Sequence, residues 1–259
     1  MKKYVSDLLV NETERLHEDY VLLRLTDPQA PLPPMSPGQF VEIRVDESPS
    51  TFLRRPISIH YVDRERNELW LLVHIVGDGT RKLATLRKGD RLNCLYPLGH
   101  GYTVPDTPGQ RVLLVGGGIG SAPLLYYGEQ LLAARCTPYF LLGGRSRKDL
   151  LQLEEFCKLG EVFLTTDDGT AGMQGFVTQH TLWDNAAYDR IAVCGPKPMM
   201  KAVAHMAHER DIRCEISLEN LMACGLGACL CCVEKDADGH HVCVCQEGPV
   251  FDTGRLGWK

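Results

Sequence analysis

Hydrophobic positions alternate with polar ones through the first part of the chain. Val41, Ile43 and Val45 alternate with charged residues, and apolar residues share each face of a run over 69–76. A period of two is the pattern of a β-strand. Turn formers separate such runs, in clusters at 33–34, 36–38, 77–79 and 88–90. Short strands at this spacing predict a small antiparallel β-barrel, which we assign to residues 1–102.

A different pattern begins after a turn-rich linker, Thr103–Gln110. Short, continuous apolar runs alternate with stretches of helical character, and the runs lie at 112–115, 139–142, 162–164 and 191–194. Such runs are typical of parallel strands whose two faces are both covered by helices. Residues 103–213 are therefore predicted to form an α/β domain around a parallel sheet.

The end of the chain is dominated by cysteine. Six of the eleven cysteines lie beyond residue 214, where few apolar residues are available for a core. In a reducing compartment, a dense cysteine cluster indicates a metal site before it indicates disulfides. We predict a small domain over residues 214–259 that folds around a metal, and a fold class of α+β multi-domain for the whole chain. The scattered cysteines are expected to be buried thiols: Cys94, Cys136, Cys157, Cys194 and Cys214.

Composition and charge exclude several classes of protein. The 259 residues are 44% hydrophobic and 24% charged, with a net charge of −5, which is typical of a globular protein and does not suggest nucleic-acid binding. No apolar run approaches the roughly 18 residues that span a bilayer, so no membrane segment is expected. The first residues contain two lysines without an apolar stretch behind them, so we expect no signal peptide and a cytoplasmic protein.

Three of the clustered cysteines, Cys224, Cys229 and Cys232, have the spacing C-x4-C-x2-C. Plant-type proteins hold a [2Fe-2S] cluster with this spacing. Gly225 and Gly227 lie in the longer gap, where small residues let backbone N–H groups approach the sulfurs. The alternative is a zinc site with four cysteine ligands, although zinc usually takes a C-x2-C pair at each end.

Two choices among the ligands stay open on local chemistry. Cys231 and Cys232 are adjacent, and only Cys232 completes the shorter gap from Cys229. Cys243 and Cys245 both lie downstream and compete for the fourth position.

Two segments of the predicted barrel suit a flavin cofactor. Arg55 stands at the entry of a strand, where a guanidinium can pair with a pyrophosphate, and Ser58 follows within reach of a flavin ring. The glycines of Gly77–Thr80 let backbone N–H groups approach a phosphate. Taken singly, the first segment is equally a barrel strand with a surface arginine, and the second an ordinary hairpin turn. Together, ahead of a parallel-sheet domain, they favour a flavin site.

A glycine-rich turn, Val115–Pro123, follows a buried strand and opens a helix. Gly116, Gly118 and Gly120 let the backbone approach a pyrophosphate at the helix N-terminus. The segment departs from the usual dinucleotide fingerprint, since Ser121 replaces the third glycine and no acidic residue ends the second strand. The alternative is a glycine-rich turn that binds no ligand.

Cys194 and Gly195 end a later strand in the same way. Ligands of open parallel sheets bind at the carboxyl ends of strands, so Cys194 is placed to face a nicotinamide, with a buried core thiol as the alternative. Arg145, Arg147 and Lys148, just past the second strand, can bind a 2′-phosphate, so NADP stays open beside NAD.

Together these motifs resemble the ferredoxin reductase-like family, whose flavin barrel carries R-x-Y-S/T and whose nucleotide domain carries GGxGxxP and CGPxxM. The corresponding segments here are Arg55–Ser58, Gly116–Pro123 and Cys194–Met199, and the resemblance covers almost the whole chain. Ile57 stands where that family usually has tyrosine, which puts an aromatic stack on the flavin from this position in doubt.

The tail narrows the resemblance to the electron-transfer subunits of type B dihydroorotate dehydrogenase. Glu219–Cys229 and Cys245–Phe251 are similar to that family's tail, in which the fourth cluster ligand directly precedes x-[DE]-G-P-V-F. The resemblance therefore implies Cys245 rather than Cys243, and it implies FAD, NAD and a [2Fe-2S] cluster as cofactors. It carries over these FAD-binding positions: Arg55, Pro56, Ile57, Ser58, Leu72, Val73, His74, Gly79 and Thr80.

The resemblance also implies a partner and a reaction. An FMN-containing catalytic subunit, in a two-plus-two heterotetramer, oxidises dihydroorotate to orotate in pyrimidine (UMP) biosynthesis. Electrons then pass through the cluster to FAD, and a hydride passes to NAD. The sequence offers no acid–base dyad or nucleophile, and an electron-transfer subunit needs none. The competing hypotheses are the small flavin–iron-sulfur subunit of a ferredoxin:NADP reductase or sulfide dehydrogenase, and a zinc-stabilised binding protein.

Overall fold

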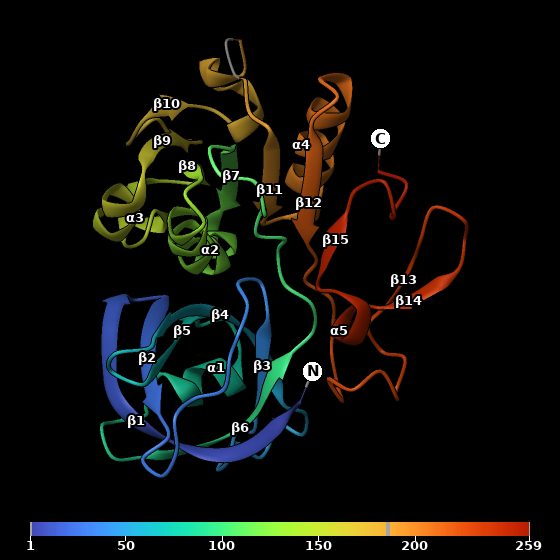
Figure 1. Ribbon diagram of the computed structural model, residues 1–259. Helices are drawn as coiled ribbons and strands as arrows, with labels where there is room; N and C mark the ends of the chain where they lie inside the picture. Colours follow the sequence, from blue (N-terminus) through green and yellow to red (C-terminus); the bar gives the residue numbers. More distant parts are fainter. Residues whose placement is uncertain (1, 185–186, 259) are drawn as a thin grey trace.

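The computed structural model describes residues 2–184 and 187–258. It shows a β-barrel, an α/β sheet and a cysteine-rich tail, with helix α2 (Ala122–Ala133) lying between the barrel and the sheet (Figure 1). The predicted fold class is confirmed.

Six antiparallel strands close the barrel in the order β1-β2-β5-β4-β3-β6. Their bounds are Tyr4–His17 (β1), Tyr20–Thr26 (β2), Phe40–Ile43 (β3), Arg55–Asp63 (β4), Glu68–His74 (β5) and Arg91–Leu98 (β6). Inward side chains such as Leu23, Val41 and Val73 are fully buried, as the period of two requires. A short helix, α1 (Asp78–Leu83), follows β5 where the sequence indicated a turn.

The α/β sheet has seven strands in the order β10-β9-β8-β7-β11-β12-β15. Their bounds are Arg111–Gly117 (β7), Thr137–Gly144 (β8), Glu161–Thr166 (β9), Met173–Gln174 (β10), Arg190–Cys194 (β11), Arg213–Ser217 (β12) and Val250–Asp252 (β15). All neighbours pair in parallel except β15, which is antiparallel to β12. The predicted parallel sheet is therefore present, with one antiparallel edge strand added by the tail.

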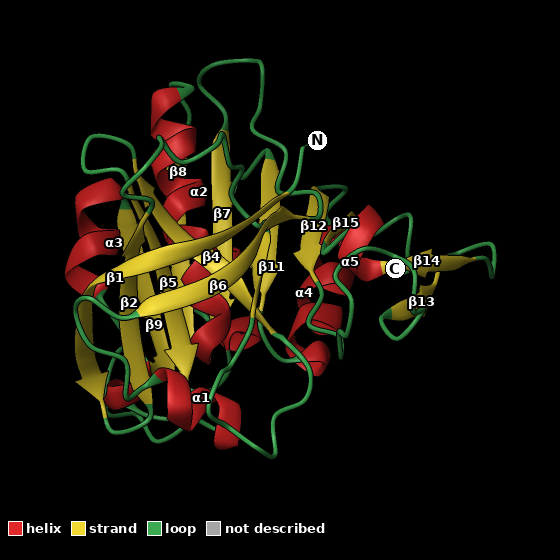
Figure 2. Cartoon of the chain, turned by 90° about the horizontal axis from the view of Figure 1, so that it is seen from below, coloured by secondary structure: helices red, strands yellow, loops and turns green. Residues whose placement is uncertain are grey.

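Helices cover both faces of this sheet, as its continuous apolar runs predicted (Figure 2). Along β7, Leu114 packs toward helix α2, while Val115 packs in a cluster with residues of α4 (Lys197–Glu209). Helix α3 (Leu153–Leu159) lies on the α2 side. Short 3₁₀ turns complete the domain at Gly118–Ser121, Arg147–Asp149, Val177–Gln179 and Thr181–Asp184.

The cysteine-rich tail does not form a separate core. A hairpin of β13 (Val233–Lys235) and β14 (His241–Cys243) leads into a single helical turn, α5 (Val244–Glu247). Buried tail residues pack in the same cluster as residues of β11, β12 and α4. The domain boundary that we propose between 213 and 214 falls inside β12, so the tail is an extension of the nucleotide domain in its packing.

Four of the five scattered cysteines are buried, as expected, whereas Cys157 is exposed on helix α3. Cys157 lies on the solvent face of this short helix, whose one fully buried residue is its neighbour Phe156. None of the described helices is both long enough and apolar enough to traverse a lipid bilayer.

Candidate cofactor sites

A cavity of about 710 Å³ lies between the barrel and the α/β sheet. The barrel contributes Tyr20 and His74, whose rings stack with centroids 4.7 Å apart. The sheet contributes the loops that follow β7, β8 and β11, which include Gly118, Arg145 and Gly195. Because the carboxyl ends of parallel strands meet here, the cavity has the position at which α/β sheets bind ligands.

The glycine-rich turn forms part of the wall of this cavity, and its glycines differ in their surroundings. A Cβ at Gly116 would lie 2.9 Å from Cα of Ser121, and one at Gly120 would lie 2.5 Å from the carbonyl oxygen of Cys194. Gly116 therefore lets the turn fold back onto its own Ser121, and Gly120 lets the turn pack against the end of β11. Gly118 has a φ of +55° and nothing within 4 Å of an added Cβ, so it faces the open cavity. The turn therefore fits a pyrophosphate approaching its backbone N–H groups.

Cys194 and Gly195, at the end of β11, differ in their exposure to the cavity. Gly195 lines the cavity, whereas the described residues that line it do not include Cys194, which is 1% exposed. Burial raises the pKa of the Cys194 thiol well above its usual range, although a hydrogen bond with Ser217 opposes this. The arrangement favours the core-thiol alternative for the Cys194 side chain, and leaves Gly195 as the proposed contact to a nicotinamide.

Arg55 lies at the start of β4, directly beside Gly79 at the start of α1. A Cβ at Gly79 would lie 3.1 Å from Nε of Arg55, so the missing side chain lets the guanidinium approach the helix backbone. Arg55 donates to the carbonyl oxygen of Leu53 at 2.9 Å, and among residues 2–184 and 187–258 it forms no ion pair. An uncompensated guanidinium beside helical N–H groups fits the pyrophosphate of a flavin dinucleotide.

Thr80 has a local role in the same turn. Its hydroxyl oxygen accepts hydrogen bonds from the backbone N–H of Val76 at 2.9 Å and of Gly77 at 3.0 Å. It thereby caps α1, so that only its backbone remains for the proposed phosphate contact.

The remaining flavin positions lie on the neighbouring strands β4 and β5 (Figure 1). Pro56, Ile57 and Ser58 are half-buried. Val73 points into the barrel core, so its backbone is what a flavin would contact. Leu72 packs against residues of the α/β domain, including Ala122 of helix α2.

The clustered cysteines come together in two pairs. The side chain of Cys224 is hydrogen-bonded to Cys229, and that of Cys245 to Cys232. Backbone N–H groups also point at these sulfurs: Leu226 donates to Cys224 at 3.3 Å, Gly227 to Cys245 at 3.2 Å, and Cys245 to Cys232 at 3.3 Å. N–H donors around thiolates are the surroundings that an iron–sulfur cluster needs.

The environment of Cys224 favours the thiolate, which is the form that binds metal. Desolvation opposes ionisation there, but hydrogen bonds from the backbone of Leu226 and from Cys229 outweigh it and lower the pKa of Cys224 to about 6.

The two open choices among the ligands differ in their contacts. Cys245 is buried beside Cys232, whereas Cys243 directs its Sγ toward the carbonyl oxygen of Gly227 at 3.9 Å. Cys231 is exposed. These contacts support the set Cys224, Cys229, Cys232 and Cys245, which we keep as a proposal.

Sequence patterns missed two acidic residues at these sites. Glu219 lines the cavity next to Gly195, and desolvation raises the pKa of its carboxyl. Glu42 is fully buried on β3, and neither of its carboxyl oxygens has a hydrogen-bond partner in the part of the chain that the structure describes. Burial raises the pKa of Glu42 to about 7. Alternation along β3 indicated an outward position for Glu42, and the tail covers that face: a Cβ at Gly225 would lie 2.9 Å from Cγ of Glu42.

The loop after β8 leaves the choice of nicotinamide cofactor open. Arg145 and Lys148 line the cavity, and so do Asp149 and Asp167. Both signs of charge are therefore available at the end of the cavity where an adenosine ribose would lie.

Two family models match the chain. Residues 219–257 match the iron–sulfur cluster binding domain of dihydroorotate dehydrogenase B, and residues 114–205 match an oxidoreductase NAD-binding domain.

Similar proteins span nearly the whole chain. "Dihydroorotate dehydrogenase B (NAD(+)), electron transfer subunit" of Desulforamulus reducens is 41% identical over 233 residues, which is 86% of this chain and 87% of that protein. The protein of the same name from Bacillus cereus strain Q1 is 41% identical over 225 residues, which is 85% of this chain and 86% of that protein.

Solved structures share the architecture. A structure of the NADH-dependent reduced ferredoxin-NADP oxidoreductase superimposes with a TM-score of 0.86 at 28% identity, covering 98% of this chain and 90% of the other. A ferredoxin NADP+ reductase from Neisseria gonorrhoeae with bound FAD and NADP has a TM-score of 0.65 at 17% identity, covering 81% and 92% of the two chains, and shows the fold alone.

Proposed function

This chain belongs to the family of electron-transfer subunits of NAD+-dependent dihydroorotate dehydrogenase B. On that premise, we propose which of its residues hold the cofactors that carry electrons from a catalytic partner to NAD. It is an oxidoreductase subunit that uses a [2Fe-2S] cluster, FAD and NAD. The zinc-protein hypothesis is not favoured, since the matched tail domain is an iron–sulfur domain.

One observation supports the electron path more than any other. The cluster loop contacts the barrel through Gly225, which lies against Glu42 and Leu98. Glu42 is paired in register with Pro56, which belongs to the proposed flavin segment of β4. The cluster loop is therefore one strand away from the flavin segment, while the nucleotide turn faces the same barrel across the cavity. This order supports a flavin site between the cluster and the nicotinamide.

The proposed flavin site works through positioning and charge. Arg55 and the first turn of α1 hold the pyrophosphate, and residues 55–58 and 72–74 hold the ring between the barrel and the cavity. When bound, FAD supplies the exchange between one-electron and two-electron transfer. The chain itself contributes the fixed geometry of β4 and β5 and the exclusion of water by the packed domain contact.

The proposed nicotinamide site uses the turn that contains Gly116, Gly118 and Gly120 for the pyrophosphate, and Gly195 for the nicotinamide. The backbone N–H groups at the start of α2 provide the positive end of a helix dipole for the phosphates. The four proposed cluster ligands are Cys224, Cys229, Cys232 and Cys245.

The name of the related proteins implies a catalytic partner subunit. We propose that this partner contains FMN, oxidises dihydroorotate to orotate, and assembles with the present chain in a two-plus-two heterotetramer. The exposed leucines beside the cluster, Leu221, Leu226 and Leu230, are the surface that we assign to this contact. All eleven cysteines are free thiols in the structure, which suits a reducing compartment, and we propose the cytoplasm.

The alternative, a subunit of a ferredoxin:NADP reductase or sulfide dehydrogenase, is not favoured. The solved reduced ferredoxin-NADP oxidoreductase is 28% identical, whereas the dihydroorotate dehydrogenase relatives are 41% identical over most of the chain.

Reconstitution tests the proposal. Purified chain alone should oxidise NADH with artificial acceptors and show no activity with dihydroorotate. Addition of the FMN subunit should give orotate and NADH in equal amounts, with NAD preferred over NADP. Full dihydroorotate:NAD activity from either chain alone, or the absence of a complex on size exclusion, would contradict the assignment.

A further inference from the structure

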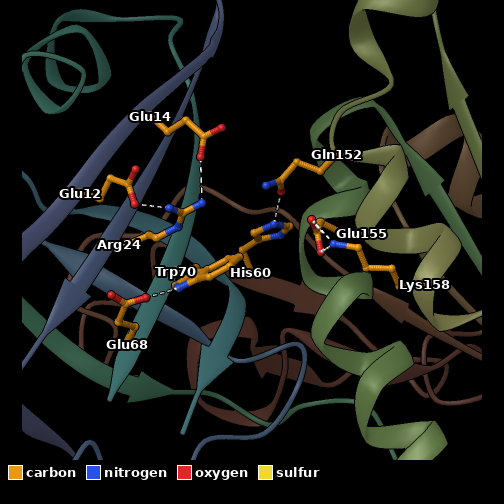
Figure 3. A network of polar contacts seen from close by, with 9 residues as sticks. All are labelled: Glu12, Glu14, Arg24, His60, Glu68, Trp70, Gln152, Glu155 and Lys158. Atoms are coloured by element: carbon orange, nitrogen blue, oxygen red, sulfur yellow. Dashed lines mark hydrogen bonds and ion pairs between the residues drawn. The ribbon is translucent and has the colours of Figure 1, made fainter. Parts of the chain in front are cut away.

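His60 links the proposed flavin strand to the proposed nucleotide turn. It lies two residues after Ser58 on β4 and is 1% exposed. Its Nδ1 lies 2.6 Å from the carbonyl oxygen of Ala122, and its Nε2 lies 2.5 Å from Oε1 of Gln152. Figure 3 shows the ring reaching from the barrel toward Gln152, on the far side of the domain contact.

The hydrogen bond to Ala122 fixes one proton on this imidazole. A carbonyl oxygen only accepts, so Nδ1 must carry the proton that is donated to Ala122. Burial lowers the pKa of His60, and the hydrogen bonds to Ala122 and Gln152 oppose this effect. Nε2 lies within hydrogen-bonding distance of the Gln152 amide, so this contact is kept in either protonation state: a protonated Nε2 donates to Oε1, and a bare Nε2 accepts from the amide turned to present its NH₂ group.

Both partners of His60 belong to the machinery on the nucleotide side. Ala122 is the first residue of α2 and directly follows Ser121, the last residue of the glycine-rich turn. Gln152 stands before α3 with a left-handed backbone, φ +51°, and its neighbour Leu151 packs with Leu72 of β5. A displacement of the ring would therefore move the turn relative to the flavin strand.

We infer that His60 is a positioning residue, which fixes the nucleotide turn against the flavin strand so that nicotinamide and flavin meet at reacting distance. This inference rests on the proposed placement of FAD on β4 and of the nucleotide at residues 118–121. His60 exchanges no proton during the reaction. Its effect is geometric, and a misplacement of about 1 Å between reacting groups can cost on the order of 100-fold in rate.

Other contacts hold the two domains together and provide a matched control. Tyr61, the next residue on β4, donates to Glu129 of α2 at 2.5 Å, and Tyr126 donates to the carbonyl oxygen of Met35 at 3.0 Å. The two helix residues in these contacts, Tyr126 and Glu129, lie further along α2 than Ala122. Tyr61→Phe removes one domain contact without touching the first residue of α2.

The first test needs no variant and no turnover. The ¹⁵N chemical shifts of the His60 ring, measured in the FAD- and cluster-loaded chain at pH 7, should show a protonated Nδ1. A ring without a proton on Nδ1 cannot donate to the carbonyl oxygen of Ala122 and would overturn the inference.

The second test compares variants. His60→Leu should preserve FAD and iron content, leave the Kd for NADH within about 3-fold, and slow flavin reduction at saturating NADH by about 10–100-fold. Amide hydrogen exchange at residues 118–121 should rise at least about 10-fold in this variant. His60→Asn, whose amide can replace the Nδ1–H donor, should recover most of both effects, and Tyr61→Phe should show neither.

These outcomes separate the inference from the proposed function. If NADH fails to reduce the flavin of the wild-type chain, the proposed nicotinamide site is wrong. If the wild type is reduced while His60→Leu matches it in both rate and exchange, the role of His60 is wrong. Should His60→Leu fail to fold, Gln152→Leu is compared instead: it should raise amide exchange at residues 118–121 and slow flavin reduction, and wild-type values of both would overturn the inference.

Discussion

Two glycine-rich loops lie against different strands of the barrel, where we propose that they hold the nicotinamide cofactor and the cluster, and they are stabilised in different ways. The nucleotide turn, 116–121, connects buried strand β7 to helix α2, and its Gly120 packs tightly against the end of β11. The cluster loop, 224–232, contains no helix or strand in the described structure, and most of its residues are exposed or half-buried. One site is formed by the apolar core beneath it, whereas the other depends on the metal that it binds.

The two loops differ in the interactions that stabilise their folded conformation. Strand β7 buries apolar residues on both faces, so the turn that follows it is held whether or not a nucleotide is present. The cluster loop has left-handed backbone at Gly225, Gly227 and Leu230 and few buried side chains to offset it. Metal–thiolate bonds supply folding energy in such segments.

The largest effect is expected from a substitution that removes the cluster and leaves the nucleotide turn intact. Cys229→Ser should abolish iron and acid-labile sulfide and raise amide exchange across 224–245, because the loop loses the bonds that order it. FAD content and the exchange of β7 should not change. Cys231→Ser is the matched control and should keep its iron. Retention of a full cluster in Cys229→Ser would show that this residue is not a ligand.

The next largest effect is expected from a substitution in the nucleotide turn that blocks NADH binding and leaves the cluster loop intact. Gly118→Val should abolish flavin reduction by NADH, because its side chain would enter the cavity and its branched Cβ would also strain the left-handed backbone of the turn, φ +55°. FAD and iron should remain. Gly120→Ala sharpens the comparison: its Cβ would lie 2.5 Å from the Cys194 carbonyl oxygen, so it should lower the free energy of unfolding by about 1–3 kcal/mol. Wild-type kinetics in Gly118→Val would contradict the placement of the nucleotide.

A pH effect should appear where the cluster loop covers the barrel. The pKa of Glu42 is about 7 in the folded chain and 4.5 as its ordinary value, so the folded state binds the proton more tightly. This contribution to stability is fully present below about pH 4.5 and is lost as the pH rises through 7, by at most about 3 kcal/mol. Glu42→Gln should flatten the fall between pH 5 and 8 in denaturant unfolding of the loaded chain. A variant as pH-dependent as the wild type would show that Glu42 ionises freely.

The smallest expected effect concerns the flavin, whose proposed site lies between the two loops. Arg55→Ala should weaken flavin binding by about 1.5–3 kcal/mol, the value of a charge-assisted hydrogen bond. Equilibrium dialysis measures the loss, with cluster content as the internal control. Flavin retention equal to that of the wild type would remove Arg55 from the proposed phosphate site.

Local patterns predicted the barrel, the parallel sheet and the position of each loop, because periodicity reports which face of a strand is buried. They failed where burial comes from a distant segment. Glu42 alternates with apolar residues as an exposed position would, yet the tail covers it. The joining of β15 to β12 likewise depends on where the chain returns after the cluster loop.

The choice between Cys243 and Cys245 could not be made from spacing, because both lie at similar separations from Cys232. The structure distinguishes them through packing, since the helical turn α5 buries Cys245 and leaves Cys243 half-buried. His60 carried no sequence signal, because a polar residue in a strand does not reveal that another domain lies against it.

The most direct measurement of the central claim follows electrons through the cluster. Dihydroorotate and NAD are mixed anaerobically with the reconstituted complex. The signal of the reduced [2Fe-2S] cluster is recorded by freeze-quench electron paramagnetic resonance, and NADH formation is followed in parallel. The wild-type complex should show cluster reduction before NADH appears, and a Cys229→Ser complex that retains FMN and FAD should form orotate once and almost no NADH. NADH formation at the wild-type rate in that complex would show that electrons do not pass through the cluster.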